Sequence, residues 1–337
     1  MNANDSQFQV GLGVEINMKR IIAGFLSAFI LISLTGLSAC GGKSGTANGT
    51  TGEKKISVYT SFYAMYDFAK KIGGEKINLT NLVPAGTEPH DWEPTPKDIA
   101  NLSKANVLIY NGAGMEGWMD KVLSALNNKK LVVVEASKEI KLIKNEHEDG
   151  AEAENEDSGH EEMEYDPHVW LNPAYAKKQM EVIKDALVSA DPGNKEYYEQ
   201  NFAEHAKKID DLDQEFKDAV SKFSKKEIIV AHEAFGYLCE AYGLKQVAIE
   251  GIAADAEPSP ARMGEIVKFA KENNVKYIFF EELVSPKVAE TIAREVGAKT
   301  EVLNPIEGLE EEDIKAGKEY ISVMKENLEA LKKALQE

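Results

Sequence analysis

The chain has 337 residues and a net charge of −18, with 57 acidic residues against 39 basic ones and only two cysteines. Such an acidic balance argues against nucleic acid as a partner. The cysteine count excludes a disulfide-stapled fold. About 285 residues remain after the N-terminal segment, enough for two domains with their own cores.

The N-terminal segment has the order of a secretory signal. A basic pair precedes a charge-free apolar run that ends in LSAC, with Cys40 as its last residue. This order is typical of a signal peptide, and LSAC resembles the lipobox of bacterial lipoproteins, which implies a lipid on Cys40. We therefore predict a signal peptide over 18–39, followed by the lipidated cysteine and a flexible tether over 40–54.

The residues on either side of this signal complete the prediction. Residues 1–17 show no signal character and are interpreted as a start-site artefact, because Met18 is the better start. An uncleaved anchor helix is the alternative to cleavage, since the apolar run is long enough to consider. Lipidation would hold the protein at the outer face of the cell membrane. It would also leave Cys239 without a disulfide partner, and we expect this residue to pack as a small hydrophobe.

Short runs rich in β-branched residues alternate with amphipathic stretches, which predicts βα units and parallel sheets. Strands are expected to begin at Ile56, Ile77, Asn106, Leu131, Glu227, Lys245, Lys276 and Lys299. Helices are expected between them at 65–72, 96–104, 116–126, 260–273 and 286–296. The pattern predicts an α/β fold with two similar lobes, 55–190 and 225–337, each a four-stranded, mainly parallel sheet with flanking helices.

One long helix is predicted to join the two lobes, within the segment 191–224. Apolar residues recur there every three to four positions between Tyr198 and Phe223, after an Asp-Pro start signal. At 1.5 Å per residue this rigid helix would be roughly 45 Å long, which would limit hinge motion between the lobes. A second charged helix, from Glu311 to the end, is expected to cover the second sheet.

Two histidines lie in nearly matching stretches, GTEPHDWEPTP around His90 and EYDPHVWLNP around His168. The prolines beside them restrict the local backbone, and the tryptophans two positions further on are placed to shield the histidines from water. A third histidine, His232, closes the strand predicted from Glu227. Because ligands bind beyond the carboxyl ends of parallel strands, we expect the three histidines to share an interlobe site.

A carboxylate from the second lobe is expected to complete this site. The candidates from position alone are Glu307 in LNPIEGL, or Glu281 and Glu282 at the end of KYIFFEE. Asp91 and Asp166 are candidate partners for the second nitrogen of the neighbouring imidazoles.

The three histidine motifs, GTEPHDWEPTP, DPHVWLNP and AHEAFGYL, resemble those of the metal-specific solute-binding lipoproteins of bacterial ABC importers, in particular the zinc branch. The resemblance implies two α/β lobes joined by a rigid helix, with a metal in the cleft. It carries the ligand roles onto His90, His168 and His232, and it selects Glu307 over Glu281 as the fourth ligand. It further implies an ABC transporter permease as partner, a membrane attachment through lipid, and a monomer.

Three neutral imidazoles and one carboxylate suit tetrahedral Zn²⁺, whereas manganese prefers more oxygen ligands. The manganese branch of the same family has a carboxylate where this chain has His232, so zinc is predicted as the transported ligand and manganese is the alternative. Four protein ligands leave no position for an activated water, which favours capture over hydrolysis. The protein is therefore not predicted to be an enzyme.

The acidic loop, 144–165, carries ten acids between 146 and 164 and no basic residue in that stretch. It is predicted to be a disordered, solvated charge run. In the zinc branch a loop rich in histidine and acid occupies the same place. His147 and His160 are accordingly candidate secondary ligands that would collect zinc weakly.

Three other hypotheses for the function compete with zinc capture. Gly112, Gly114 and Gly117 form a G-x-G-x-x-G run, a dinucleotide fingerprint, but it follows the third strand of its lobe rather than the first. HEAFG at His232 begins like the H-E-x-x-H protease motif, but residue 236 is glycine. A surface adhesin is the third alternative, without an adhesive repeat to support it.

Overall fold

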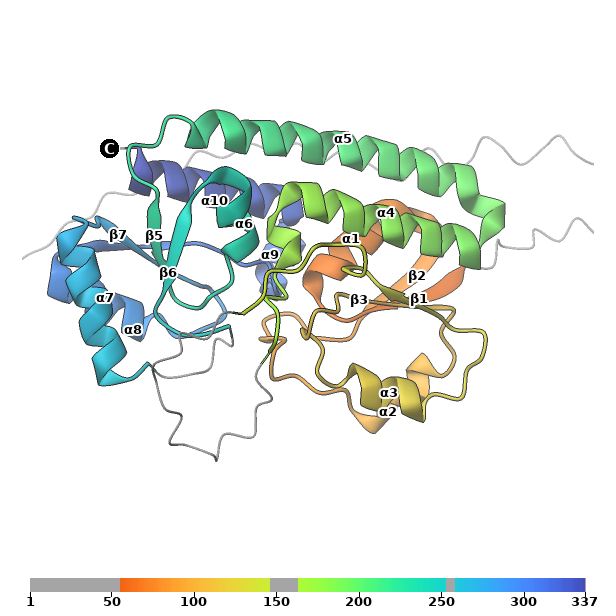
Figure 1. Cartoon of the computed structure of the whole chain (residues 1–337). Coiled ribbons are helices and arrows are strands. Elements are labelled where there is room, and N and C mark those ends of the chain that lie inside the picture. Colours follow the sequence, from red (N-terminus) through yellow and green to blue (C-terminus); the bar gives the residue numbers. More distant parts are fainter. Residues whose placement is uncertain (1–54, 146–162, 253–257, 337) are drawn as a thin grey trace, which may run out of the picture. The chain divides into compact units, whose positions relative to one another are not determined.

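The computed structural model describes residues 55–145, 163–252 and 258–336. Two four-stranded sheets form its framework (Figure 1). The first contains β1 (Ile56–Thr60), β2 (Ile77–Asn81), β3 (Val107–Tyr110) and β4 (Val132–Glu135). The second contains β5 (Glu227–Val230), β6 (Lys245–Ala248), β7 (Tyr277–Phe280) and β8 (Lys299–Val302).

Both sheets have the same strand order, β2-β1-β3-β4 in one and β6-β5-β7-β8 in the other. All of these strand pairs are parallel, as in β1 and β2, where Ile56 lies opposite Ile77. The predicted α/β fold with two similar lobes is confirmed, and so are its eight strands. We refer to the sheet of β1–β4 with its helices as the first lobe and to that of β5–β8 as the second lobe.

Helices cover both faces of each sheet. Their bounds are α1 (Tyr63–Gly73), α2 (Pro96–Leu102), α3 (Met119–Ala125), α4 (Pro173–Ala190), α5 (Lys195–Val220), α6 (Gly236–Tyr242), α7 (Pro260–Glu272), α8 (Lys287–Val296), α9 (Glu311–Ala316) and α10 (Tyr320–Leu335). Short 3₁₀ turns lie at Gly74–Lys76, Val169–Leu171 and Pro192–Asn194. In Figure 1, α2 and α3 lie on one face of the first sheet, opposite α1 and α4. Among the helices of the described ranges, none has the length and apolar character needed to span a membrane.

Local capping explains where several helices begin. The Thr95 side chain accepts the N–H of Asp98 while the Asp98 carboxylate accepts the N–H of Thr95, a capping box that starts α2. Asn172 and Ser259 cap α4 and α7 in the same position, each followed by a proline at the first helical residue. The caps of α2 and α4 end the loops that carry His90 and His168.

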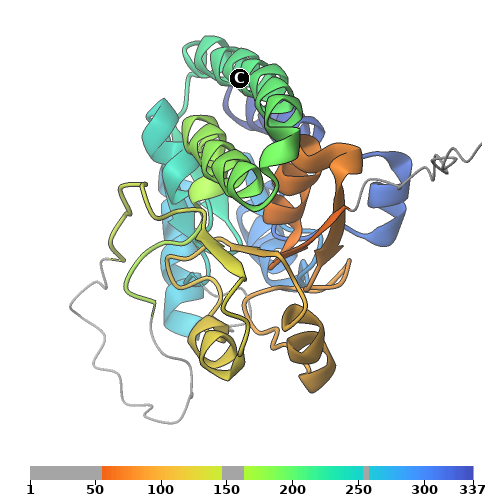
Figure 2. The ribbon, with the colours of Figure 1, turned by 90° about the vertical axis from the view of Figure 1, so that its right-hand side faces the viewer.

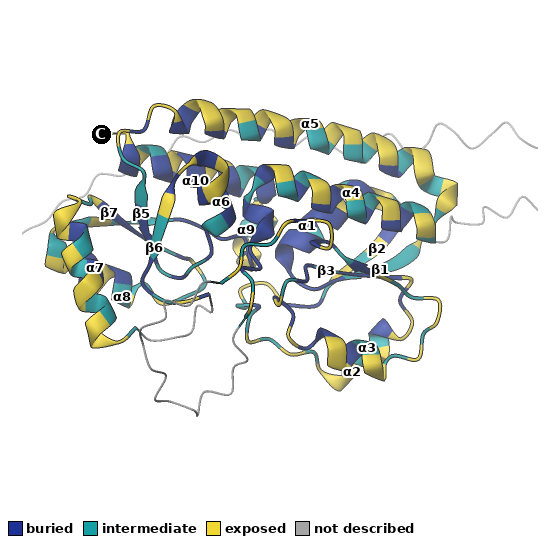
Figure 3. Cartoon of the chain, viewed as in Figure 1, coloured by how far each residue is buried: buried dark blue, intermediate teal, exposed yellow. Residues whose placement is uncertain are grey.

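The long joining helix is α5, whose 26 residues span about 39 Å. It contacts α1 and α4 of the first lobe and α6 and α10 of the second, and Figure 2 shows α4 and α5 side by side. Its buried side chains Tyr198, Ile209, Leu212 and Phe216 keep the predicted three-to-four spacing. Its outward side carries exposed residues, as Figure 3 shows.

The structure corrects two of the expected helices and adds two others. The C-terminal segment is two helices rather than one, because Gly317 with φ of +88° ends α9 and a turn precedes α10. Helix α3 begins at Met119 rather than at Glu116, whose side chain holds the preceding turn. Helix α4, with 18 residues, and helix α6 were not predicted.

One buried cluster runs through both lobes. It joins Phe62 and Phe68 of the first lobe to Val230 and Leu331 of the second, with Phe216 of α5 between. Two smaller clusters fill the outer faces, one under α2 and α3 and the other under α7 and α8. A shared apolar core of this kind resists large separation of the lobes.

Hydrogen bonds reinforce the seam between the lobes. The Trp170 indole N–H donates to the Pro305 carbonyl at 2.7 Å, and the Tyr320 hydroxyl donates to the Trp170 carbonyl at 2.7 Å. The Gly86 N–H donates to the Leu309 carbonyl at 3.0 Å. These bonds hold the loops of both lobes in register around the candidate site.

Candidate metal centre

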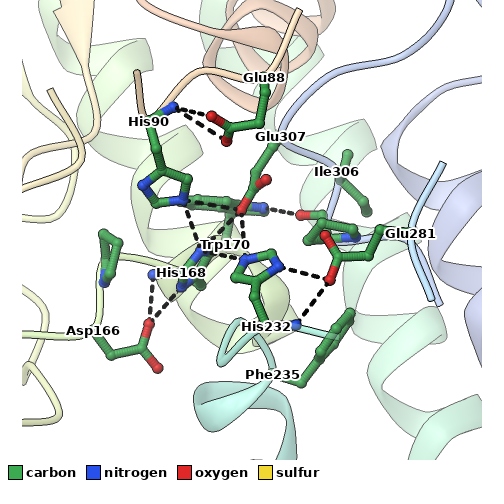
Figure 4. Close-up of polar contacts among 12 residues, drawn as sticks. Glu88, His90, Asp166, His168, Trp170, His232, Phe235, Glu281, Ile306 and Glu307 are labelled. Carbon is green, nitrogen blue, oxygen red and sulfur yellow. Dashed lines mark hydrogen bonds and ion pairs between the residues drawn. The ribbon is translucent and has the colours of Figure 1, made fainter. Parts of the chain in front are cut away.

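Four side chains from four separate loops converge at the seam (Figure 4). His90 lies in the loop after β2, and His168 stands directly before the 3₁₀ turn Val169–Leu171. His232 follows β5 by two residues, and Glu307 lies in the loop after β8. Three of these loops leave the carboxyl ends of parallel strands, where ligand sites of such sheets form.

The contact distances fit a small tetrahedral ion. The Nε2 atoms of His90 and His232 each lie 3.3 Å from Glu307 Oε1. His168 Nε2 lies 2.8 Å from the same oxygen, 3.3 Å from His90 Nε2 and 3.4 Å from His232 Nε2. Zinc bonds of about 2.0–2.2 Å in a tetrahedron place ligand atoms roughly 3.3–3.6 Å apart. The ligand atoms of all four residues lie within 4.8 Å of one another.

Two buried carboxylates orient two of the imidazoles. Asp166 Oδ1 lies 2.8 Å from His168 Nδ1 and also accepts the backbone N–H of His168 at 2.9 Å. Glu281 Oε1 lies 2.6 Å from His232 Nδ1. A carboxylate on the far nitrogen fixes the tautomer and leaves Nε2 free for a metal. Glu281 was a candidate direct ligand in the sequence, but in the structure it contacts the far nitrogen of the ligand His232 instead.

The third imidazole is positioned through its backbone. The Glu88 carboxylate accepts the N–H of His90, with its oxygens at 3.0 and 3.2 Å. Burial raises the pKa of Glu88. Asp91 was the predicted partner of this imidazole, but it is exposed and its own N–H donates to Glu88. Acid-Pro-His occurs in both EPH and DPH, and this repeat was the signal that could have identified Glu88.

The loop that carries Glu307 has a strained backbone. Ile306 is fully buried with φ of +61°, a left-handed conformation that costs a β-branched residue about 1–3 kcal/mol. The Asn304 side chain accepts the Ile306 N–H at 2.7 Å, and Asn327 of α10 holds the backbone of Asn304 from both sides. Glu282, the other candidate ligand, instead accepts the Asn304 amide at 2.9 Å.

The protonation states of the site's carboxylate and imidazoles depend on one another. Burial opposes ionisation of Glu307, but the three histidines, His232 foremost, hold the pKa of its carboxyl well below the ordinary value. Burial likewise opposes protonation of His232, but Glu281 and Glu307 raise the pKa of this imidazole well above its ordinary value. Hydrogen bonds to Asp166 and Glu307 raise the pKa of His168 in the same way against burial. Glu307 is thus an anion within reach of three imidazoles.

The tryptophans expected to shield the site take different positions. Trp170 is fully buried, with its ring 5.3 Å from the His168 ring between centroids. Trp92 instead packs at right angles against Trp118, 5.5 Å away. Of these two tryptophans, only Trp170 has its ring against an imidazole of the cluster.

The glycine-rich turn after β3 is occupied by the protein's own carboxylate. Glu116 is buried and accepts the N–H of Asn111 at 2.8 Å and the N–H of Gly112 at 3.0 Å. A nucleotide phosphate would need these donors, so the dinucleotide interpretation of the motif loses its basis.

Some of the predicted residues lie outside the described residues. They are Cys40, His147 and His160, together with most of the acidic loop. Cys239 is described and is a buried free cysteine. Burial raises the pKa of its thiol to about 12, so it packs as an inert hydrophobe, as predicted.

The family description "Zinc-uptake complex component A periplasmic" (ZnuA) matches residues 58–334. The chain is 46% identical over 303 residues to the high-affinity zinc uptake system protein ZnuA of Bacillus subtilis (strain 168), covering 89% of this chain and 93% of that protein. It is 42% identical over 286 residues to the zinc-binding lipoprotein AdcA of Streptococcus pneumoniae (strain ATCC BAA-255 / R6). That match covers 85% of this chain but only 57% of AdcA, so the chain spans little more than half of that relative.

Solved structures agree in fold. The Zn(II)-bound ZnuA-like domain of Streptococcus pneumoniae AdcA superposes with a TM-score of 0.72 at 41% identity, covering 84% of this chain and all of that one. The laminin binding protein Lmb of Streptococcus agalactiae, a bifunctional protein with adhesin and metal transporting activity, reaches a TM-score of 0.72 at 33% identity over 83% of this chain and 99% of that one. The extent of the family match, and the convergence of four metal-binding side chains at the seam, lead to one conclusion: this chain belongs to the ZnuA family of zinc-uptake complex components.

Proposed function

We propose that the protein captures Zn²⁺ with His90, His168, His232 and Glu307 and delivers it to an ABC permease for uptake. The observation that carries the proposal is the set of contacts among the four ligand atoms, most of them 3.3–3.4 Å long. These contacts already have the spacing of ligands of a tetrahedral zinc, and only His168 and Glu307, 2.8 Å apart, would have to part slightly to admit the ion. Zinc is the transported ligand here rather than a resident cofactor.

The donor set supports zinc over manganese. Three imidazole nitrogens and one carboxylate oxygen are ligands that zinc accepts at four-coordination, whereas manganese favours octahedral oxygen sites. Burial of His168, His232 and Glu307 leaves little room for the water ligands that a six-coordinate ion would add. Manganese remains the alternative that a competition experiment tests.

The same closed geometry supports capture rather than catalysis. A hydrolytic zinc keeps one coordination position for water, and four protein ligands fill a tetrahedron. We therefore infer a binding protein and not an enzyme. One chain supplies all four ligands, so a monomer would suffice for capture.

The relatives' names support an extracytoplasmic, membrane-attached receptor, and we propose lipid on Cys40 as the attachment. Delivery then requires a limited movement of the lobes around α5. The shared core and the seam between Trp170, Pro305 and Tyr320 favour a small opening over a wide hinge.

The proposed function can be tested in cells whose zinc uptake depends on this protein. Growth and zinc accumulation under zinc limitation are expected to fail with H90A or H232A and to persist with H205A, a histidine on α5 away from the site. Adhesion through another surface would survive all three substitutions. Normal zinc uptake with H232A would refute the proposal.

Acidification is predicted to weaken zinc binding. The pKa values of His168 and His232 are raised above 6.5. Protons therefore begin to compete with zinc for these imidazoles above pH 6.5, and the competition grows as the pH falls. Glu307 stays ionised over this range, because the pKa of its carboxyl is lowered. If zinc displaces one proton, its binding constant changes about tenfold per pH unit. A loss of zinc affinity of at least about tenfold is therefore expected between pH 7 and 5. Competition with a chromophoric chelator measures it, and a constant affinity over this range contradicts the site.

A further inference from the structure

The carboxylate that orients His168 lies against the first residue of a helix in the other lobe. Asp166 belongs to the first lobe and is buried, and its Oδ1 is committed to the N–H and the Nδ1 of His168. Its Oδ2 points at Gly236, where α6 begins. A Cβ on Gly236 would lie 2.4 Å from Oδ2, well inside any real contact. The carboxylate therefore occupies the space that a side chain at 236 would fill.

Backbone conformation does not require glycine at this position. Gly236 is not among the glycines with positive φ, and alanine is favoured over glycine at helical positions. The remaining neighbour of the added Cβ is the Gln246 amide at 3.4 Å, an ordinary contact. What excludes a side chain here is the Asp166 carboxylate.

The next residue of α6 fixes the backbone of the same segment. The Tyr237 hydroxyl donates to the Asp166 carbonyl at 2.8 Å and accepts the Ile143 N–H at 2.9 Å. Asp166 and Ile143 are themselves paired, since the Asp166 N–H donates to the Ile143 carbonyl at 3.0 Å. Tyr237 is fully buried, so its hydroxyl extends, from the second lobe, the pairing of two first-lobe loop segments that meet at the isolated bridge between Lys144 and Tyr165.

We propose that Gly236 and Tyr237 are positioning residues for the zinc site, which hold the Asp166 carboxylate where it orients His168. Neither touches the metal, and both belong to the second lobe while His168 belongs to the first. Tight coordination by His168 thus depends on contact between the lobes at the start of α6. When that contact loosens, the second lobe no longer confines the Asp166 side chain, so its hold on His168 Nδ1 weakens and lobe movement weakens zinc binding. The inference rests on the proposed zinc capture.

The direct test is G236A in the full-length protein, with zinc affinity measured by chelator competition. Loss of an outer carboxylate contact typically weakens metal binding 10–100-fold, so a loss of about tenfold or more is expected. The matched control is G264A, a helical glycine in α7 of the same lobe with nothing within 4 Å of its added Cβ. G264A is expected to bind zinc within about twofold of the unsubstituted protein.

A double-substitution cycle separates this role from a general packing effect. D166A removes the atom that the new Cβ meets, so G236A is expected to have no further effect in a D166A background. A merely structural role would make the two losses add. Cobalt supplies a second readout: the visible spectrum of bound Co²⁺ should shift in G236A and D166A alike, and remain unchanged in G264A.

The outcomes are distinct. If the unsubstituted protein binds no zinc, the proposed function itself fails. If it binds zinc and G236A matches it in affinity and cobalt spectrum, only the positioning role is overturned. Should G236A fail to fold, Y237F decides, because it keeps the ring and removes only the hydroxyl. A several-fold loss of zinc affinity in Y237F supports the role, and unchanged affinity overturns it.

Discussion

Replacing His232 by alanine is expected to weaken zinc binding by two to three orders of magnitude. Structural zinc sites with four ligands bind with about 10–16 kcal/mol, so one ligand contributes roughly a quarter, or about 2.5–4 kcal/mol. At 1.4 kcal/mol per factor of ten this corresponds to about 10²–10³ in affinity. His232 is the sharpest choice because it is fully buried and touches both Glu281 and Glu307. Calorimetry or chelator competition at pH 7.5 measures the loss.

The control for this substitution is H205A. His205 lies half-buried on α5 and is not one of the four converging side chains, so its loss should leave the zinc affinity unchanged. Circular dichroism of H232A checks that the apo protein still folds. An H232A variant that is folded and binds zinc as tightly as the parent would remove His232 from the site.

Removing zinc is expected to lower the melting temperature by about 10 °C. His90 and His168 come from the first lobe while His232 and Glu307 come from the second, so the ion cross-links the lobes. At a thousand times the dissociation constant, a ligand that binds only the folded state adds about 4 kcal/mol. Each kcal/mol shifts the melting temperature of a protein of this size by roughly 2–4 °C. Calorimetric scans with zinc and with chelator measure the difference.

The control for this experiment is the H90A/H168A/H232A triple variant. Its melting temperature should not respond to zinc or to chelator, because it lacks the imidazoles that link the lobes. Equal melting temperatures of the parent with and without zinc would contradict a site built across the seam.

The sequence predicted the framework well because its signals are local. The strand runs around Val58 and Ile229 are rich in β-branched residues, and the apolar spacing along α5 repeats over seven turns. Prolines and capping residues such as Thr95 mark where helices start. The histidine motifs predicted a common site for three imidazoles, and the structure brings these side chains together with Glu307. The choice of Glu307 followed from the resemblance rather than from any pattern of its own.

What the sequence did not reveal depends on distant contacts. Helix α4 is an exception, because Asn172-Pro173 is a good local start signal for it. The roles of Glu281 and Glu88 are decided by which nitrogen each carboxylate reaches, which depends on the packing of whole lobes. Gly236 carries no signal in the sequence, since its significance lies in an atom of Asp166, seventy positions earlier in the chain.

Elemental analysis of the purified protein, beginning after Cys40, tests the central claim most directly. Samples of the parent and of the H90A/H168A/H232A variant are dialysed with zinc and manganese together, and the bound metals are counted. The account predicts one zinc per parent chain, no manganese, and no stoichiometric metal in the variant. A parent chain without zinc, or a variant that retains one zinc per chain, would contradict it.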